Sequence, residues 1–340
     1  MQVAGTGPQA LDGRSLHVWA IAAAGALERV APRIDALNVF PVADGDTGTN
    51  TSLTFAAGLA ALDRVRPVSA VEAADVLARG ALAAARGSSG VILGAWLTGF
   101  ATGLASGASP GRHAGGGGPG APELVGALRT AALTARAAVE RPSPGTVLDI
   151  ADQVAQEAGG EPLDRVLPAA VAAAREGLAA TSERHPVLRA AGVVDAGACA
   201  LLVVLESLAA VLAGGSAGSV GDWVPGGSPR AHEEPVGGAF EVMGMLDVSA
   251  DATTVRSLLG HLGDALAVVG DRDGWRTHVH TDVPADVLDV LGGHRLAHAV
   301  VRAVHGPHQP AAVVVTRDVQ QAVWFAAAGT AAVLPGAAVD

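Results

Sequence analysis

The chain has 340 residues, which is enough for two domains, and half of its residues are apolar. This apolar content and the net charge of −11 exclude a disordered tail and a nucleic-acid-binding protein with a basic face. All 22 basic residues are arginine. The absence of lysine excludes a Walker-A phosphate loop and a Schiff-base mechanism.

A single cysteine, Cys199, excludes an intrachain disulfide and a thiolate metal cluster, and its small apolar neighbours predict a buried side chain. No basic, apolar and small-residue series marks a signal peptide at the N-terminus. The apolar segment 91–105 is shorter than the roughly 20 residues that span a bilayer, and glycines interrupt it. We therefore expect a soluble, cytoplasmic protein with no integral membrane segment and no nucleic-acid partner.

Apolar residues recur at helical spacing over most of the first 213 residues. Two segments rich in Gly, Ser and Pro are typical of a loop (106–122) and of an interdomain linker (214–238). Eight helices are predicted, near Ser15–Val30, Asn50–Val65, Ala70–Ala85, Ser89–Gly103, Pro122–Glu140, Thr146–Glu157, Leu163–Thr181 and Ala196–Leu212.

The even-numbered helices of this series begin after segments rich in glycine and hydroxyl side chains. In an up-and-down bundle, even-numbered helices start at the same end. Four helix N-termini with free N–H groups would then face one region, which suits an anion such as phosphate. One missed helix would scatter these starts to opposite ends.

The residues after the linker predict a smaller α/β domain. Strands are expected at 239–246, 265–269 and 277–281, with a turn at 270–274 and a helix at 252–262. Short helices are expected at 286–291 and 296–303. A final β-α-β unit is expected from the strands at 311–316 and 331–334 and the helix at 319–328.

Two aspartates, Asp44 and Asp46, stand two residues apart in an Asp-Gly-Asp sequence before the second helix. In an extended loop their side chains point the same way, which suits a shared Mg²⁺ that keeps waters and binds substrate phosphates. Asn38 offers a further oxygen ligand, and Thr47, Thr49 and Asn50 could cap the helix or contact phosphate. A surface turn with a helix cap explains the same residues and stays open as an alternative.

The segment Leu37–Asn50 closely resembles the signature of the dihydroxyacetone-kinase L-type (DhaL) ATP-binding domain. This version is most similar to the bacterial fatty acid kinase A subunit family. Further matching segments follow in the same order, at 85–93, 144–146 and 192–197, and the resemblance continues through Glu241, 262–264 and 278–281 into the family's middle domain.

The resemblance implies a mainly α fold, an eight-helix antiparallel DhaL-type barrel followed by a smaller α/β domain. It also implies ATP and two Mg²⁺ ions at one end of the barrel, with the catalytic and metal-binding roles on Asp44, Asp46 and Asn38. The implied nucleotide-binding residues are Thr47, Gly48, Thr49, Asn50, Ser88, Ser89, Gly90, Thr146, Asp195 and Gly197.

On a strand, His278 and His280 would point to one face and form half of a Zn²⁺ site. The family's middle domain resembles one that binds zinc with this histidine pair and a cysteine, but alanine (Ala239) stands near the cysteine position here. Asp264, Asp282 or another histidine could replace the cysteine. Histidines that are only packed or solvated are an equal alternative.

The resemblance implies a kinase that phosphorylates the carboxylate of a fatty acid presented by a fatty-acid-binding carrier protein, and family members look dimeric. Two alternatives stay open: a nucleotide-binding regulatory protein without catalysis, and one subunit of a dihydroxyacetone kinase (glycerone kinase). The expected organisation is a kinase domain at 10–213, a linker at 214–238, a middle domain at 239–308 and a remnant of a third domain at 309–340.

Overall fold

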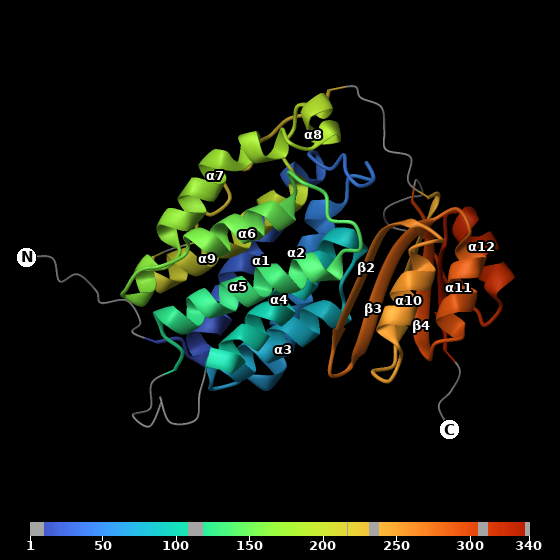
Figure 1. Cartoon of the computed structure of the whole chain (residues 1–340), viewed down its shortest axis with the longest axis horizontal. Coiled ribbons are helices and arrows are strands. Elements are labelled where there is room, and N and C mark those ends of the chain that lie inside the picture. Colours follow the sequence, from blue (N-terminus) through green and yellow to red (C-terminus); the bar gives the residue numbers. More distant parts are fainter. Residues whose placement is uncertain (1–9, 108–117, 216, 231–237, 305–311, 337–340) are drawn as a thin grey trace, which may run out of the picture. The chain divides into compact units, whose positions relative to one another are not determined.

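The computed structural model describes residues 10–107, 118–215, 217–230, 238–304 and 312–336 (Figure 1). The chain divides into two compact units. The helical unit comprises residues 1–40, 47–136 and 143–233. The sheet unit comprises residues 41–46, 137–142 and 234–340, so the loop with the two aspartates clusters with the sheet. The predicted loop at 106–122 and linker at 214–238 lie partly outside the described residues.

Long antiparallel helices, with two short ones, build the helical unit, in agreement with the predicted fold class (Figure 1). The described helices are α1 (Gly13–Asp35), α2 (Thr47–Val65), α3 (Ala70–Ala83), α4 (Gly87–Gly107), α5 (Ala121–Ala138), α6 (Val147–Glu157), the 3₁₀ turn Leu163–Arg165, α7 (Pro168–Ser182), α8 (Pro186–Ala191) and α9 (Ala196–Leu212).

Two details of the helix prediction are wrong. The segment 163–181 is not one helix, because Pro168 starts α7 anew after the 3₁₀ turn, as proline at the first helical position does. The short helix α8 is missing from the prediction, since six residues are too few to show a helical period. It falls between α7 and α9, so the eight predicted long helices keep their order and α9 takes the eighth place.

Small residues let the helices pack closely around a few aromatic rings. A Cβ atom at Gly99 of α4 would lie 2.7 Å from the Ala131 Cα atom of α5, so only glycine permits this contact. Trp19 packs against Phe55 and Phe100 at centroid distances of 5.9 and 5.5 Å. Cys199 is fully buried, as predicted. These contacts fix the helices that carry the candidate site.

Helix α4 is long and apolar enough to cross a membrane by length and composition. However, 67% of its most apolar window is buried inside the structure, which is typical of a core helix. With 21 residues, α4 extends beyond the apolar segment 91–105 at both ends, which is why the whole helix has the length of a span and that segment alone does not.

The sheet unit contains one six-stranded sheet in the order β2-β3-β1-β4-β6-β5. Helices α10 (Ala252–Leu259), α11 (Pro284–Gly292) and α12 (Val319–Ala327) pack on one face through a shared apolar core. The strands are β1 (Phe240–Leu246), β2 (Asp264–Asp271), β3 (Gly274–Thr281), β4 (Leu296–Ala303), β5 (Val313–Val315) and β6 (Ala331–Pro335).

The segment 296–303 is a strand, and the helix predicted there is wrong. β4 pairs with β1 on one side and with β6 on the other, and its β-branched Val300 and Val301 suit a pleated surface. The non-local pairing outweighs the helical preference of its alanines and leucine. Strands β5 and β6, which the sequence assigns to a third domain, extend this same sheet.

Candidate functional site

The first residues of α2 and α4 lie against each other. Gly87 opens α4 with φ +60°, and a Cβ atom there would lie 2.5 Å from the Asn50 side-chain nitrogen. A Cβ atom at Gly90 would lie 2.5 Å from Thr54 Oγ1. Among the described residues, the buried Nδ2 of Asn50 finds no hydrogen-bond acceptor. This donor therefore suits an acceptor atom of a ligand.

The other predicted residues of these two helix starts differ in their hydrogen bonds, packing and burial. Thr49 donates from both its backbone N–H and its hydroxyl to the Asp35 carboxylate, at 2.9 and 2.7 Å. Gly48 permits close packing, because a Cβ atom there would lie 2.3 Å from the Ala31 carbonyl oxygen. Thr47 is buried, whereas Ser88 and Ser89 are half-buried in the first turn of α4.

The starts of α6 and α9 meet through Asp195. Its carboxylate accepts from the backbone N–H of Ala198 at 2.7 Å and also bonds the N–H of Val147. Burial raises the pKa of Asp195 to about 6, although these two N–H groups favour its charged form. A Cβ atom at Gly197 would lie 3.4 Å from Val147. Asp195 thus holds two helix N-termini together.

The partly buried Phe40 and the buried His185 lie beside the start of α6. Phe40 and His185 are in ring contact, with centroids 4.0 Å apart. The backbone of Gly145 approaches His185 so closely that a Cβ atom there would lie 2.8 Å from its backbone nitrogen. Thr146 is buried and donates its hydroxyl to the Ser143 carbonyl instead of capping α6. Asn38 is also buried, in the segment after α1.

In the sheet unit, Asp44, Asp46, Glu241 and Arg302 lie together at the segment 41–46, which we call the metal loop. Arg302 Nη2 donates to Asp46 Oδ2 at 2.9 Å, and Arg302 Nε donates to Glu241 Oε2. Burial raises the pKa of Asp44 to about 8, and the carboxylates of Asp46 and Glu241 add to the shift. Neighbouring carboxylates disfavour one another's charged form, and a bound cation would relieve this repulsion.

A second polar cluster joins the predicted histidine pair to Glu241. The three side chains are buried, and their ligand atoms lie within 4.8 Å of one another. His278 Nε2 lies 2.9 Å from Glu241 Oε1, and the His278 and His280 ring centroids are 4.9 Å apart. His280 Nδ1 is buried and has no hydrogen-bond partner among the described residues.

The electrostatics of this cluster suit a cation. Burial and the neighbouring His278 and Arg302 lower the pKa of His280 to about 3, so its imidazole is neutral at pH 7. Burial alone would raise the pKa of Glu241, but hydrogen bonds and charge from His278 and Arg302 hold it well below its usual range. A neutral imidazole and a carboxylate are the protonation states of metal ligands.

Asp264 and Asp282, the suggested replacements for the missing cysteine, are not members of the cluster of Glu241, His278 and His280. Asp264 is exposed and pairs with Arg141 at 2.6 Å. Asp282 accepts a hydrogen bond from the backbone N–H of Ala239 at 2.8 Å. The sequence alone did not predict that Glu241 lies beside the two histidines, because this proximity arises only when β1 pairs with β3.

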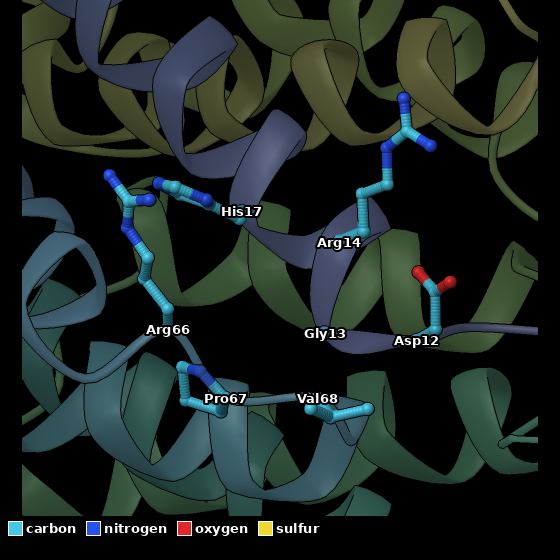
Figure 2. A pocket seen from close by; sticks show the side chains of 7 residues that line it. All are labelled: Asp12, Gly13, Arg14, His17, Arg66, Pro67 and Val68. Atoms are coloured by element: carbon cyan, nitrogen blue, oxygen red, sulfur yellow. The ribbon is translucent and has the colours of Figure 1, made fainter.

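A separate pocket of about 460 Å³ lies in the helical unit (Figure 2). It contains none of the predicted site residues. Its lining residues come from the N-cap and first turns of α1 and from the segment that follows α2, and they are Asp12, Gly13, Arg14, His17, Arg66, Pro67 and Val68.

Two family models match this chain. Residues 41–210, half of the chain, match the DAK2 domain, and residues 238–295 match the middle domain of proteins like the A subunit of fatty acid kinase. Both polar clusters of the sheet unit have members in these segments. Asp44 and Asp46 lie in the first, and Glu241, His278 and His280 lie in the second.

Similar proteins match this chain over about half of a longer chain. Protein YloV of Bacillus subtilis is 32% identical over 300 residues, which cover 82% of this chain and 53% of that protein. An uncharacterized protein of Staphylococcus haemolyticus is 30% identical over 299 residues, covering 82% of this chain and 52% of that one. The chain thus spans about half the length of the curated relatives it matches.

A search of solved structures found the dihydroxyacetone kinase from C. freundii in complex with AMP-PNP and Mg²⁺. The TM-score is 0.41 at 21% sequence identity, over 62% of this chain and 36% of that one. The sequence matches establish the relationship without this structure. The chain belongs to the DAK2-domain family, in the form that carries a middle domain like that of the fatty acid kinase A subunit.

Proposed function

We propose that the protein is an ATP- and Mg²⁺-dependent phosphotransferase of the kinase type. The observation that carries the proposal is the carboxylate pair of the half-buried Asp44 and the buried Asp46, which lies within the matched DAK2 segment directly before α2. Carboxylate oxygens are the ligands that Mg²⁺ prefers, and in phosphate chemistry the ion is held by one or two of them.

The donor set around these aspartates fits a divalent ion. The pKa of Asp44, about 8, reflects burial and the repulsion between this carboxylate and Asp46 and Glu241, which a metal ion would relieve. Asp44 and Asp46 would hold the Mg²⁺, with Asn38 as a further oxygen donor and with two ions as the family resemblance implies. A bound ion would neutralise charge on the phosphates during transfer.

The chain's own backbone would hold the nucleotide. The N-terminal turns of α2 and α4 offer backbone N–H groups, and the helix dipoles favour negative charge there. Asn50 Nδ2, which finds no acceptor among the described residues, would donate to a phosphate oxygen. The hydroxyls of Ser88 and Ser89 would add donors, and Thr146, Asp195 and Gly197 would shape the pocket from α6 and α9.

For the acceptor we propose the carboxylate of a fatty acid presented by a fatty-acid-binding carrier protein. The middle-domain match supports this choice over a small ketose. A carboxylate needs no strong base to attack phosphorus, so catalysis would rest on positioned donors and metal ions and not on a general base. A cytoplasmic location and a homodimer complete the proposal.

The test is ³²P transfer from Mg-ATP to fatty acid, with and without acyl-loaded carrier proteins. We expect acyl phosphate only when the carrier is present. Transfer to dihydroxyacetone without any carrier would instead favour the glycerone kinase alternative. Tight ATP binding without transfer to either acceptor would support a regulatory protein.

We also propose that Glu241, His278 and His280 hold a Zn²⁺ ion. Two histidines and a glutamate are a known zinc ligand set, and their ligand atoms already lie within 4.8 Å of one another. His280 Nδ1, which lacks a hydrogen-bond partner among the described residues, supports the assignment. Glu241 would then take the role of the cysteine that Ala239 replaces.

A further inference from the structure

Arg302 lies in a row of polar side chains that crosses the sheet. Glu241 of β1 stands opposite His280 of β3 on one side and opposite Arg302 of β4 on the other. Side chains opposite each other on neighbouring strands share one face of the sheet and lie about 5 Å apart. Their neighbours Val242, Val279 and Val301 belong to the apolar core under the helices, so the polar row lies on the other face.

The guanidinium of Arg302 joins this row to the metal loop. Its Nε donates to Glu241 Oε2, and its Nη2 donates to Asp46 Oδ2 at 2.9 Å. Glu241 itself is fixed from the other side, because its Oε1 lies 2.9 Å from His278 Nε2. Among the residues that the structure describes, two of the five N–H groups of the guanidinium are engaged with carboxylates, which leaves three that could serve a ligand.

This arginine is a candidate for the fixed cation at the phosphates. The chain has no lysine, so an arginine must provide any fixed positive charge at the phosphates. Arg79, which precedes the Ser88 turn in the sequence, is paired with Asp75 within its own helix. Arg302 contacts Asp46 directly and is only 26% exposed, so it is better placed than a solvated surface arginine.

We propose that Arg302 is a catalytic cation for phosphoryl transfer, held by Glu241 beside the metal-binding Asp46. This inference rests on the proposed function, since Asp46 is the metal ligand there. Asp46 would hold the ion, and the remaining N–H groups of Arg302 would donate to phosphate oxygens beside it.

The transfer itself balances without a proton from Arg302. The bond from the γ-phosphorus to the ADP oxygen breaks, and its electron pair stays on ADP. A lone pair of the acceptor carboxylate forms the new bond to phosphorus. The guanidinium keeps its protons and stabilises the charge on the transferring group, which is the role of arginine in other phosphoryl-transfer enzymes.

The first test compares Arg302→Gln with Arg317→Gln, a control at an exposed arginine of the same unit. Both variants are made in the full chain, and transfer is measured with Mg-ATP. We expect Arg302→Gln to lower the transfer rate about 10³-fold, the lower end of the range for such arginines. Arg302→Lys restores only part of the rate, because an ammonium lacks the planar fork that engages two partners.

A second readout separates this role from a structural ion pair. Mg-ADP with aluminium fluoride mimics the transferring phosphoryl group, and calorimetry measures its binding without turnover. We expect the wild type and Arg302→Gln to bind Mg-ADP alike, while the fluoride strengthens binding only in the wild type. An equal gain in both proteins, or a wild-type transfer rate in Arg302→Gln, would overturn the inference.

The two proposals fail in different ways. If the wild type does not bind Mg-nucleotide, the proposed function fails and the role of Arg302 fails with it. If the wild type binds and transfers but Arg302→Gln behaves like Arg317→Gln, only the role of Arg302 is wrong. If Arg302→Gln unfolds at a lower temperature and loses Mg-ADP binding, the arginine is structural and the inference is again overturned.

Discussion

The helical unit and the sheet unit build polar sites in different ways. In the helical unit, glycines let the first turns of neighbouring helices approach each other closely, as at Gly87 and Asn50. In the sheet unit, charged side chains such as Glu241 and Arg302 hold one another across neighbouring strands. The residues of the first kind of site belong to short contiguous sequence motifs, whereas those of the second come together only through strand pairing. Four predictions test this comparison.

The largest effect is expected at the metal loop. Asp44→Asn removes a carboxylate ligand while keeping the side-chain volume, so we expect Mg²⁺-dependent transfer to fall about 10³-fold. The measurement is the initial rate of ³²P transfer at several Mg²⁺ concentrations. Asp264→Asn, at an exposed aspartate of the sheet unit, is the control and keeps the wild-type rate. Wild-type activity in Asp44→Asn would refute the metal assignment.

The next effect concerns the cluster of Glu241, His278 and His280. His280→Ala removes one of three ligands, so we expect the Zn²⁺ affinity to fall more than about 100-fold. Loss of a residue that only hydrogen-bonds a metal ligand typically costs less than this. Competition with a chromophoric chelator measures the affinity. His261→Ala is the control, since His261 is outside the cluster. A wild-type protein that takes up no zinc would show that these histidines are only packed.

A pH effect is expected from Asp195, whose pKa rises from 3.8 to about 6 on folding because of burial. The folded state then binds more protons than the unfolded state between these values, so stability falls as pH rises from about 4 to 6. Asp195→Asn can still accept from Ala198 but does not titrate. Its stability relative to the wild type should rise over this range by on the order of 2–3 kcal/mol.

Urea unfolding at pH 4 and pH 7 measures this difference. Asp222→Asn, at an exposed carboxylate, is the matched control. A difference between Asp195→Asn and wild type that stays constant with pH would contradict the assigned role of burial.

The smallest effect is expected at the start of α4. Gly87 has φ +60°, and a Cβ atom would lie 2.5 Å from Asn50 Nδ2, so Gly87→Ala should cost about 1–2 kcal/mol of stability and weaken nucleotide binding. Thermal unfolding and nucleotide titration measure the two losses. Gly126→Ala in α5, where a Cβ atom meets nothing within 4 Å, should be neutral or slightly stabilising. Equal behaviour of the two variants would argue against this close approach.

The sequence predicts the helical unit well because its signals are local. Glycines and hydroxyl residues mark the starts of α2, α4, α6 and α9, and helical period marks the bodies of the helices. The short α8 escapes detection because six residues show no period. The roles of the nucleotide-binding residues stay predictions, and the structure adds that Asp195 joins two helix starts.

The sheet unit shows what the sequence could not reveal. The sequence of 296–303 favours a helix, in which Arg302 could not stand opposite Glu241. The partnership of Glu241 with His278 and His280 depends on β1 pairing with β3, although α10 and β2 lie between them in the chain. Non-local strand pairing is therefore the reason that the positions of Glu241 and Arg302 beside the histidines and the metal loop could not be predicted.

The most direct test of the account is calorimetric titration of the full chain with magnesium and a non-hydrolysable ATP analogue. Binding requires neither the acceptor nor a carrier, so it examines the Asp44 and Asp46 site alone. The account predicts Mg²⁺-dependent binding to the wild type and a loss of that Mg²⁺ dependence in Asp44→Asn. Equal, Mg²⁺-independent affinity in the two proteins would contradict it.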